Sequence, residues 1–301
     1  MARSGRCDSS VRRRTHQLGL LVCIAVILAG CGGGSGNAKD ATSGLTAAQI
    51  LQRSVTAATA LKSFTVDLTE VITPTTKGTI TGPAGISLSN KTTLTAKGPV
   101  VLPDRLQLDV GADVGLPIQA TLTRVGGKLF LGIIGQDYAL NVNPSTVNAI
   151  SAGRIFPAVA SWISNPKIDG RETMNGQQSV RLVGDVNAKA VTDSLMALLA
   201  ANPLGGVVKV DPAQVKTIAA KLAPQFANDH ITVWVRTNDL RPTRLSAPLT
   251  IEDGTSLSPK LTALSSDLTL NMTGFDGSFS VNAPAGAKPL NLSDLTRLAG
   301  G

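Results

Sequence analysis

Aromatic residues, cysteine and histidine are scarce in this sequence. Of 301 residues only 3% are aromatic, and there are 3 Cys and 2 His. So few thiols and imidazoles exclude a disulfide framework and make a zinc cluster implausible. Charged residues reach only 16% while hydrophobic residues reach 43%. A chain of that composition is too apolar to be disordered, and its core must rely on Val, Leu, Ile and Ala.

Motifs for catalysis are also lacking. The sequence holds no Gly-x-Ser-x-Gly elbow, and His230 follows Asn228-Asp229 in a polar turn, where a solvated imidazole is commoner than a catalytic one. Ser164-Asn165-Pro166-Lys167 matches Ser-x-x-Lys without its companion motifs, so we interpret it as a turn. A glycosidase pair of carboxylates stays open, although nothing nominates one. We predict no enzyme activity, no cofactor and no metal site.

The first thirty residues have the pattern of a secretory leader. Five Arg lie between residues 3 and 14, and an apolar run follows from Leu18 to Ala29, too short to span a bilayer. The run ends in Leu28-Ala29-Gly30-Cys31, which looks like a bacterial lipobox. We therefore predict that residues 1–30 are a signal peptide and that Cys31 carries the lipid, such as palmitate. The alternative is an ordinary signal peptide with an incidental Cys.

A glycine-rich stretch follows Cys31, and its composition is typical of a flexible tether. No strand precedes it and no Lys-Ser/Thr closes it, so a phosphate loop is disfavoured. We predict a lipidated Cys and tether over residues 31–44 and one domain over residues 45–301. The leader holds five Arg and one Asp, so its removal reduces 28 basic and 20 acidic residues to 23 and 19. This mild balance argues against a nucleic-acid partner.

Hydrophobic periodicity in the mature chain predicts an α+β fold with one large antiparallel sheet. Thr46 and Gln49 form a capping-box pattern that begins a helix ending near Lys62. Further helices are predicted near residues 144–164, 187–201 and 211–226. Period-two alternation predicts strands, with one apolar and one wet face, around residues 64–69, 105–110, 118–122, 128–134, 180–182, 231–235 and 267–272.

The apolar side of such a sheet allows two kinds of protein. Helices that pack flush on it give a filled core, and helices that stand off a curved sheet leave a cavity for apolar ligands. The scarcity of large aromatic side chains and the divided helical region 187–227 favour a cavity, but a packed core uses the same residues. The residues alone leave both open.

Several turn-and-strand patterns resemble the LppX/LprA/LprF/LprG family of mycobacterial envelope lipoproteins. They are Ala60-Leu61-Lys62-Ser63, Asn165-Pro166-Lys167-Ile168-Asp169-Gly170-Arg171-Glu172 with Asn175-Gly176-Gln177, Val180-Arg181-Leu182-Val183-Gly184, and Ile231-Thr232-Val233-Trp234-Val235. The resemblance implies a LolA/LolB-like fold, a strongly curved antiparallel half-barrel with helices over its concave face. The 187–228 helical region and the 245–301 tail are longer than the family pattern, so ligand identity does not carry over.

The resemblance further implies a carrier of acylated lipids or lipoglycans, held on the extracytoplasmic side of the cell membrane through Cys31, with a membrane transporter as a candidate partner. The alternative is a non-catalytic envelope scaffold with a filled core. By alternation, twelve residues are predicted to line the lipid cavity: Val66, Leu68, Leu106, Leu108, Val110, Leu122, Leu129, Leu131, Val180, Leu182, Val233 and Val235.

Overall fold

The computed structural model describes residues 40–78, 91–113, 117–142, 152–200, 217, 220–256 and 260–290. Residues Asp40–Gly301 form one compact unit. The leader and Cys31 lie outside the described residues, as does half of the predicted helix 211–226, residues 211–216, 218 and 219. Within the described ranges, no helix is long and apolar enough to cross a membrane.

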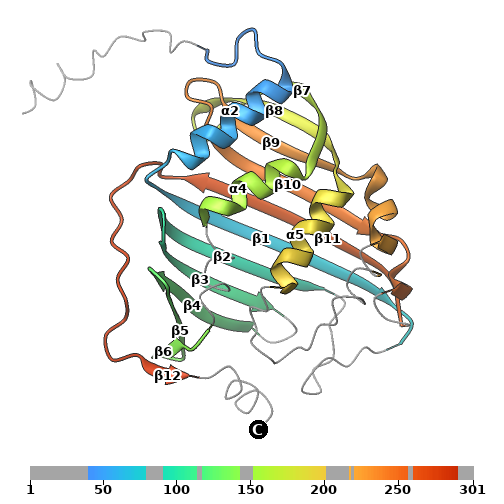
Figure 1. The fold of residues 1–301 in the computed structure, drawn as a ribbon. Helices are drawn as coiled ribbons and strands as arrows, with labels where there is room; N and C mark the ends of the chain where they lie inside the picture. Colours follow the sequence, from blue (N-terminus) through green and yellow to red (C-terminus); the bar gives the residue numbers. More distant parts are fainter. Residues whose placement is uncertain are drawn as a thin grey trace, which may run out of the picture. The chain divides into compact units, whose positions relative to one another are not determined.

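The described chain alternates a few helices with many strands (Figure 1). The helices are α2 (Ala47–Thr59), α4 (Ala152–Ser161) and α5 (Ala188–Ala200), with 3-10 turns η2 (Ala223–Asn228) and η3 (Gly254–Ser256). The strands are β1 (Ser63–Thr76), β2 (Thr92–Val101), β3 (Arg105–Asp113), β4 (Pro117–Val125), β5 (Lys128–Ile133), β6 (Gln136–Leu140), β7 (Ile163–Met174), β8 (Gln177–Val186), β9 (His230–Arg236), β10 (Pro242–Ile251), β11 (Leu261–Thr273) and β12 (Lys288–Leu290).

All twelve strands belong to one sheet, in the order β12-β6-β5-β4-β3-β2-β1-β11-β10-β9-β8-β7. Two meanders, β1 to β6 and β7 to β11, meet where β1 pairs with β11. Neighbours are antiparallel except β12, which pairs in parallel with β6. The predicted single large sheet is confirmed, although it is not purely antiparallel.

The register gives the sheet two chemically different faces. One row of directly paired residues is apolar across eight strands: Leu182, Val233, Leu245, Leu270, Leu68, Ala96, Val110 and Ala120. The next row, on the opposite face, reads Arg181, Trp234, Arg244, Asn271, Asp67, Lys97, Asp109 and Thr121. Because side chains alternate along a strand, neighbouring rows point to opposite faces.

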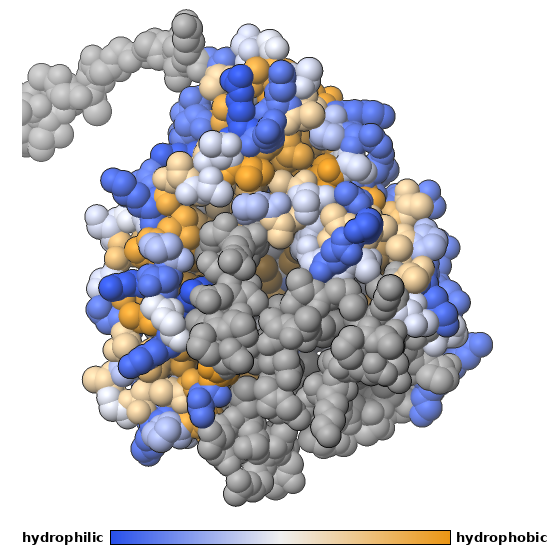
Figure 2. Space-filling view, in the orientation of Figure 1, coloured by the Kyte–Doolittle hydropathy of each residue, from blue (hydrophilic) through white to orange (hydrophobic). Residues whose placement is uncertain are grey.

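Helices α2, α4 and α5 lie across the apolar face, called here the helix-side face (Figure 1). Helix α2 packs on β7, β9 and β10, and α4 packs on β7 and on α2. Figure 2 shows hydrophobic residues gathered among these helices, with hydrophilic side chains around them. The core is therefore built mainly by β8 to β10 and the helices above them, where Val180, Val233 and Leu245 are at most 1% exposed.

Local sequence signals account for several element boundaries. Thr46 and Gln49 form the predicted capping box at the start of α2. The predicted turn at Ser164-Asn165-Pro166-Lys167 is wrong, because these residues lie within β7. The pairing of β7 with β8 shifts register between Ser164 and Lys167, and Asn165 has a φ of 48°. This irregularity admits Pro166, which cannot donate to the ladder.

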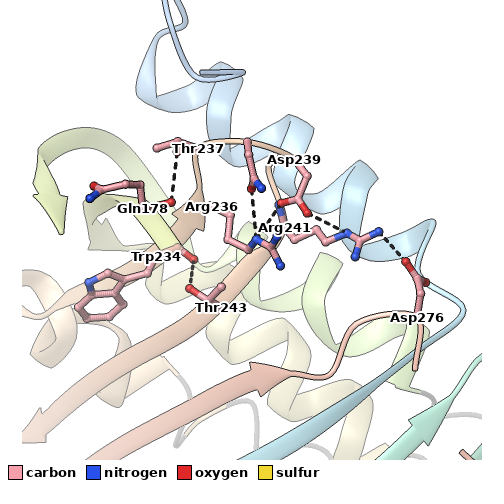
Figure 3. A network of polar contacts seen from close by, with 9 residues as sticks. Gln178, Trp234, Arg236, Thr237, Asp239, Arg241, Thr243 and Asp276 are labelled. Atoms are coloured by element: carbon pink, nitrogen blue, oxygen red, sulfur yellow. Dashed lines mark hydrogen bonds and ion pairs between the residues drawn. The ribbon is translucent and has the colours of Figure 1, made fainter. Parts of the chain in front are cut away.

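After β11 the chain runs past the ends of β2 to β5 to reach β12, and residues 274–287 of this path are called the strap (Figure 1). Its first part is held by a polar network (Figure 3). The Asp276 carboxylate accepts from the Lys62 N–H at 2.9 Å and from Arg241 Nη2 at 2.5 Å. Arg241, which also contacts Asp239, stacks its guanidinium 5.6 Å from the Phe275 ring centroid.

The packing of the core predicts that truncating two directly paired residues of one row has very different effects on stability. Leu182 is 2% exposed, whereas its cross-strand partner Ile168 on the edge strand β7 is 50% exposed. Leu182→Ala should reduce the free energy of unfolding by about 2–5 kcal/mol, and Ile168→Ala by less than about 1 kcal/mol. Urea unfolding of the two variants measures this, and similar losses would show that β7 and β8 share one buried environment.

The hydrogen bonds of Asp276 in the strap predict that this residue stabilises the fold in a pH-dependent way. The Lys62 N–H lowers the pKa of this carboxyl below its ordinary value, and Arg241 adds to the effect while partial desolvation opposes it. A lowered native pKa stabilises the fold above about pH 4 and loses that effect as pH falls through the native pKa. The melting temperature of Asp276→Asn should therefore lie below wild type at pH 7 and converge with it in acid. The exposed Asp267→Asn is the control and should show no such trend.

Candidate binding site

An apolar cavity lies between α4 and the middle of the sheet. Its lining residues are Phe64, Val66 and Leu68 from β1, Ala96 and Val100 from β2, Leu106 and Leu108 from β3, Leu270 and Met272 from β11, and Phe156 from α4. All of them are apolar, and the strands supply every one except Phe156. The sheet thus forms the floor and α4 closes the cavity from above.

The structure places the twelve predicted cavity residues in three environments on the helix-side face. Val66, Leu68, Leu106 and Leu108 line the cavity. Val180, Leu182, Val233 and Val235 are fully buried in the core under the helices, as part of the packed structure. Leu129 is buried, and Val110, Leu122 and Leu131 are half-buried further along the face. All twelve thus lie on the helix-side face, and four of them line the cavity.

Six residues that line the cavity were not among the twelve predicted from the sequence. Leu270 and Met272 belong to the predicted strand 267–272, and their alternation was the signal that could have nominated them. Val100 and Ala96 lie on β2, which no periodicity argument had singled out. Phe156 is set by the crossing of α4 over the sheet, a tertiary arrangement that no local pattern encodes.

The helix-side face changes character between its two halves. On β8 to β10 its apolar side chains are almost completely buried. On β1 to β6 many of them, including Leu94, Leu108, Leu122 and Leu131, are only half-buried. The cavity lies near the boundary between these halves. Apolar surface that keeps contact with solvent is available for burial by a ligand, about 25 cal/mol for each Å².

A polar pair interrupts the apolar face one pleat beyond Leu68. Glu70 lies on the same side of β1 as Leu68, and its carboxylate accepts a hydrogen bond of 2.8 Å from Ser266 Oγ on β11. The two side chains satisfy each other without recruiting a basic residue. This pair sets the edge of the strictly apolar region along β1.

The cavity has a volume of about 110 Å³. Ligand pockets commonly have volumes of roughly 300–1,000 Å³. The described space therefore holds a few methyl or methylene groups and not a whole acyl chain. A long chain can be accommodated only if the helices and the sheet separate further.

The surroundings of His230 do not form a nucleophilic site. His230 Nδ1 lies 3.3 Å from Asp185 Oδ1, and the imidazole is 57% exposed. Ser164 Oγ is nearby but donates to the backbone carbonyl of Asp185 rather than to the ring. Within the described ranges, no three His, Cys, Asp or Glu side chains are grouped as metal ligands would be.

Comparison with known proteins gives matches among solved structures only. No family model matches the sequence, and no curated protein sequence matches it. The chain is similar in structure to LppX and LprF. LppX of Mycobacterium tuberculosis, a lipoprotein, is 14% identical over 78% of this chain and 97% of its own, with a TM-score of 0.43. LprF of Mycobacterium bovis is 16% identical over 80% and 97%, with a TM-score of 0.42.

A LolA superfamily protein of Nitrosomonas europaea is also similar, at 10% identity over 80% of this chain and 96% of its own, with a TM-score of 0.25. LppX and LprF are two proteins of the group that the sequence resembles. At such low identities and TM-scores the likeness carries no conclusion about function.

Proposed function

We propose that this protein is a lipid-anchored, non-enzymatic carrier that binds acylated lipids or lipoglycans on the extracytoplasmic side of the cell membrane and transfers them across the envelope. One observation carries the proposal. The apolar face of the sheet continues past the helices into β1–β6, where many of its side chains, such as Leu94, Leu108 and Leu122, are half-buried and a wholly apolar cavity begins.

The energetics of acyl chains suit such a surface. Moving a sixteen-carbon chain from water to an apolar site gains about 0.8 kcal/mol per CH₂, or about 12 kcal/mol in total. That gain prevents escape into water. A bilayer offers a similar gain, so exchange between protein and membrane is close to neutral. A carrier therefore needs an apolar floor with few fixed polar contacts.

Binding a full chain requires the cavity to enlarge. We propose that the sheet bends into a half-barrel and that α4 with Phe156 moves away from it, so that the chain extends over Leu108, Val110 and Leu122. Helix α4 packs on α2 and β7 and reaches the cavity floor mainly through Phe156. It can therefore shift without disturbing the ladders of β1–β3.

The anchoring at the membrane is proposed from the leader. Cys31 would carry a diacylglycerol, whose two acyl chains hold a protein on a membrane more durably than one chain does. The residues between Cys31 and Asp40 would then link the bilayer to the compact unit. Residues 40–42 are already part of that unit, because Ala41 N–H donates to Thr237 C=O and Asp40 pairs with Arg171.

A second function is favoured by the small volume of the cavity. A cavity of about 110 Å³ also fits a nearly filled core, as in a scaffold that positions another envelope protein. A scaffold would not open to admit an acyl chain. The two functions therefore differ in whether the protein binds an added acyl probe.

Leu108→Trp tests the carrier function. Leu108 lines the cavity, and a Trp there would occupy the space that the chain enters. Because the core of the compact unit lies within residues 45–275, a soluble form comprising residues 32–301 should fold. We expect this form to bind a fluorescent sixteen-carbon fatty acid, and we expect Leu108→Trp to weaken binding at least 10-fold. Fluorescence titration measures both affinities.

The matched control is Gln107→Trp, the same substitution at the neighbouring residue, whose exposed side chain points to the other face. It should bind the probe like wild type. Absence of binding by the folded wild-type protein would contradict the carrier and leave the scaffold as the better explanation. Equal weakening by both variants would place the bound chain outside the cavity.

A further inference from the structure

The helix-side face of strands β1–β6 carries two charged side chains, Glu70 and Arg124, which differ in their hydrogen-bond partners. Glu70 is hydrogen-bonded to Ser266. Arg124 lies on β4 directly opposite Leu106 of β3 and Leu129 of β5. The unbroken pairing of residues 121–125 places Arg124 on the same face as Leu122 and therefore on the apolar side of the sheet.

Arg124 is buried without an acidic partner. It is 5% exposed, between Leu106 at 4% and Leu129 at 5%. Its Nε donates to the carbonyl of Gly126 at 3.2 Å. Across the ranges that the structure describes, no Asp or Glu oxygen lies within 4 Å of its guanidinium, and its Nη atoms donate no hydrogen bond.

The Asp104 carboxylate lies near the turn at Gly126 but does not pair with Arg124. The backbone carbonyl of Asp104 accepts from the Gly126 N–H at 3.1 Å, and a Cβ added to Gly126 would lie 3.6 Å from Asp104 Oδ2. Asp104 nevertheless forms no ion pair with Arg124 in the described structure. Among the described residues the Arg124 guanidinium therefore has no carboxylate partner.

A guanidinium in this position favours an anionic ligand. Arginine stays protonated in proteins, so burial cannot be relieved by loss of the proton. A buried charge is costly unless it is paired. The planar fork of N–H donors matches two oxygens of a phosphate or carboxylate. The Nη groups of Arg124, which donate no hydrogen bond in the described structure and are not among its fully buried unpaired atoms, offer such a fork beside an apolar floor.

The position of Arg124 relative to the cavity specifies the ligand. Leu106 lines the cavity, and directly paired residues on one face have Cβ atoms about 5 Å apart. We propose that Arg124 binds the anionic group, a phosphate or a carboxylate, of a lipid whose acyl chain lies over Leu106 and Leu108. This assignment rests on the proposed carrier function and narrows its cargo to anionic amphiphiles.

The test compares lipids with equal chains and different head groups. Dioleoylphosphatidylglycerol and dioleoylglycerol compete with the fluorescent fatty acid for residues 32–301, and oleic acid with oleyl alcohol form a second pair. We expect wild type to bind the anionic member of at least one pair about 10-fold or more tightly, because hydrogen bonds to ionised groups are the stronger ones. A preference in the first pair would indicate that Arg124 binds a phosphodiester, and a preference in the second pair would indicate that it binds a carboxylate.

Arg124→Gln should remove this preference and leave the affinity for the uncharged lipids unchanged. Arg124→Lys keeps the charge without the fork and should retain part of the preference, which a purely structural role of Arg124 would not produce. Lys128→Gln removes a charge from an exposed residue at the same hairpin and should change neither affinity. Thermal melting of the apo proteins checks folding, and Arg124→Gln should melt at or above the wild-type temperature, because it removes a buried charge that has no acidic partner among the described residues.

Three results would overturn the assignment in distinguishable ways. If folded Arg124→Gln keeps the wild-type preference, Arg124 is not the anion site, and the carrier function stands. If inorganic phosphate at millimolar concentration binds as tightly as phosphatidylglycerol, the site recognises a free anion and not a lipid. If neither member of either pair binds, the carrier function fails and the assignment fails with it.

Discussion

The shared register through the middle of the sheet, from β8 to β4, is the constraint on which the rest of this structure depends. Pairing from β8 to β4 keeps Leu182, Leu270, Leu68 and Val110 in one row and Arg181, Asn271, Asp67 and Asp109 in the next. A slip of one residue in any pair would move charged side chains to the apolar face. Helix packing, the cavity and the position of Arg124 all follow from this register.

The helices divide the apolar face into a packed half and an available half. Over β8 to β10 they bury Val180, Val233 and Leu245 almost completely, which stabilises the fold. Over β1 to β6 many apolar side chains, such as Leu108 and Leu122, keep partial contact with solvent. Apolar side chains therefore stabilise the fold in one half of the face, and we propose that they bind a ligand in the other half. The cavity under Phe156 lies near the boundary between the two halves, and core residues such as Phe64 and Leu106 form part of its lining.

Sequence reasoning recovered what depends on local chemistry. The capping box at Thr46 and the alternation in β1, β3 and β9 predicted elements and faces correctly. It missed that β7 runs through Asn165 and Pro166, since a bulge depends on the partner strand. Likewise, Arg124 carries no local signal. Its burial beside Leu106 without a carboxylate arises only when β3, β4 and β5 pair.

Native mass spectrometry of the soluble form, produced in an actinobacterial host and sprayed without prior extraction, tests whether the protein carries a lipid. We expect a protein peak shifted by the mass of one acylated lipid at near-stoichiometric occupancy. We also expect tandem dissociation to release an anionic lipid and leave an intact apo protein. A lipid-free protein that gains no mass when mixed with acylated lipids would rule out the carrier function, because the apolar face over β1–β6 would then be closed to ligands.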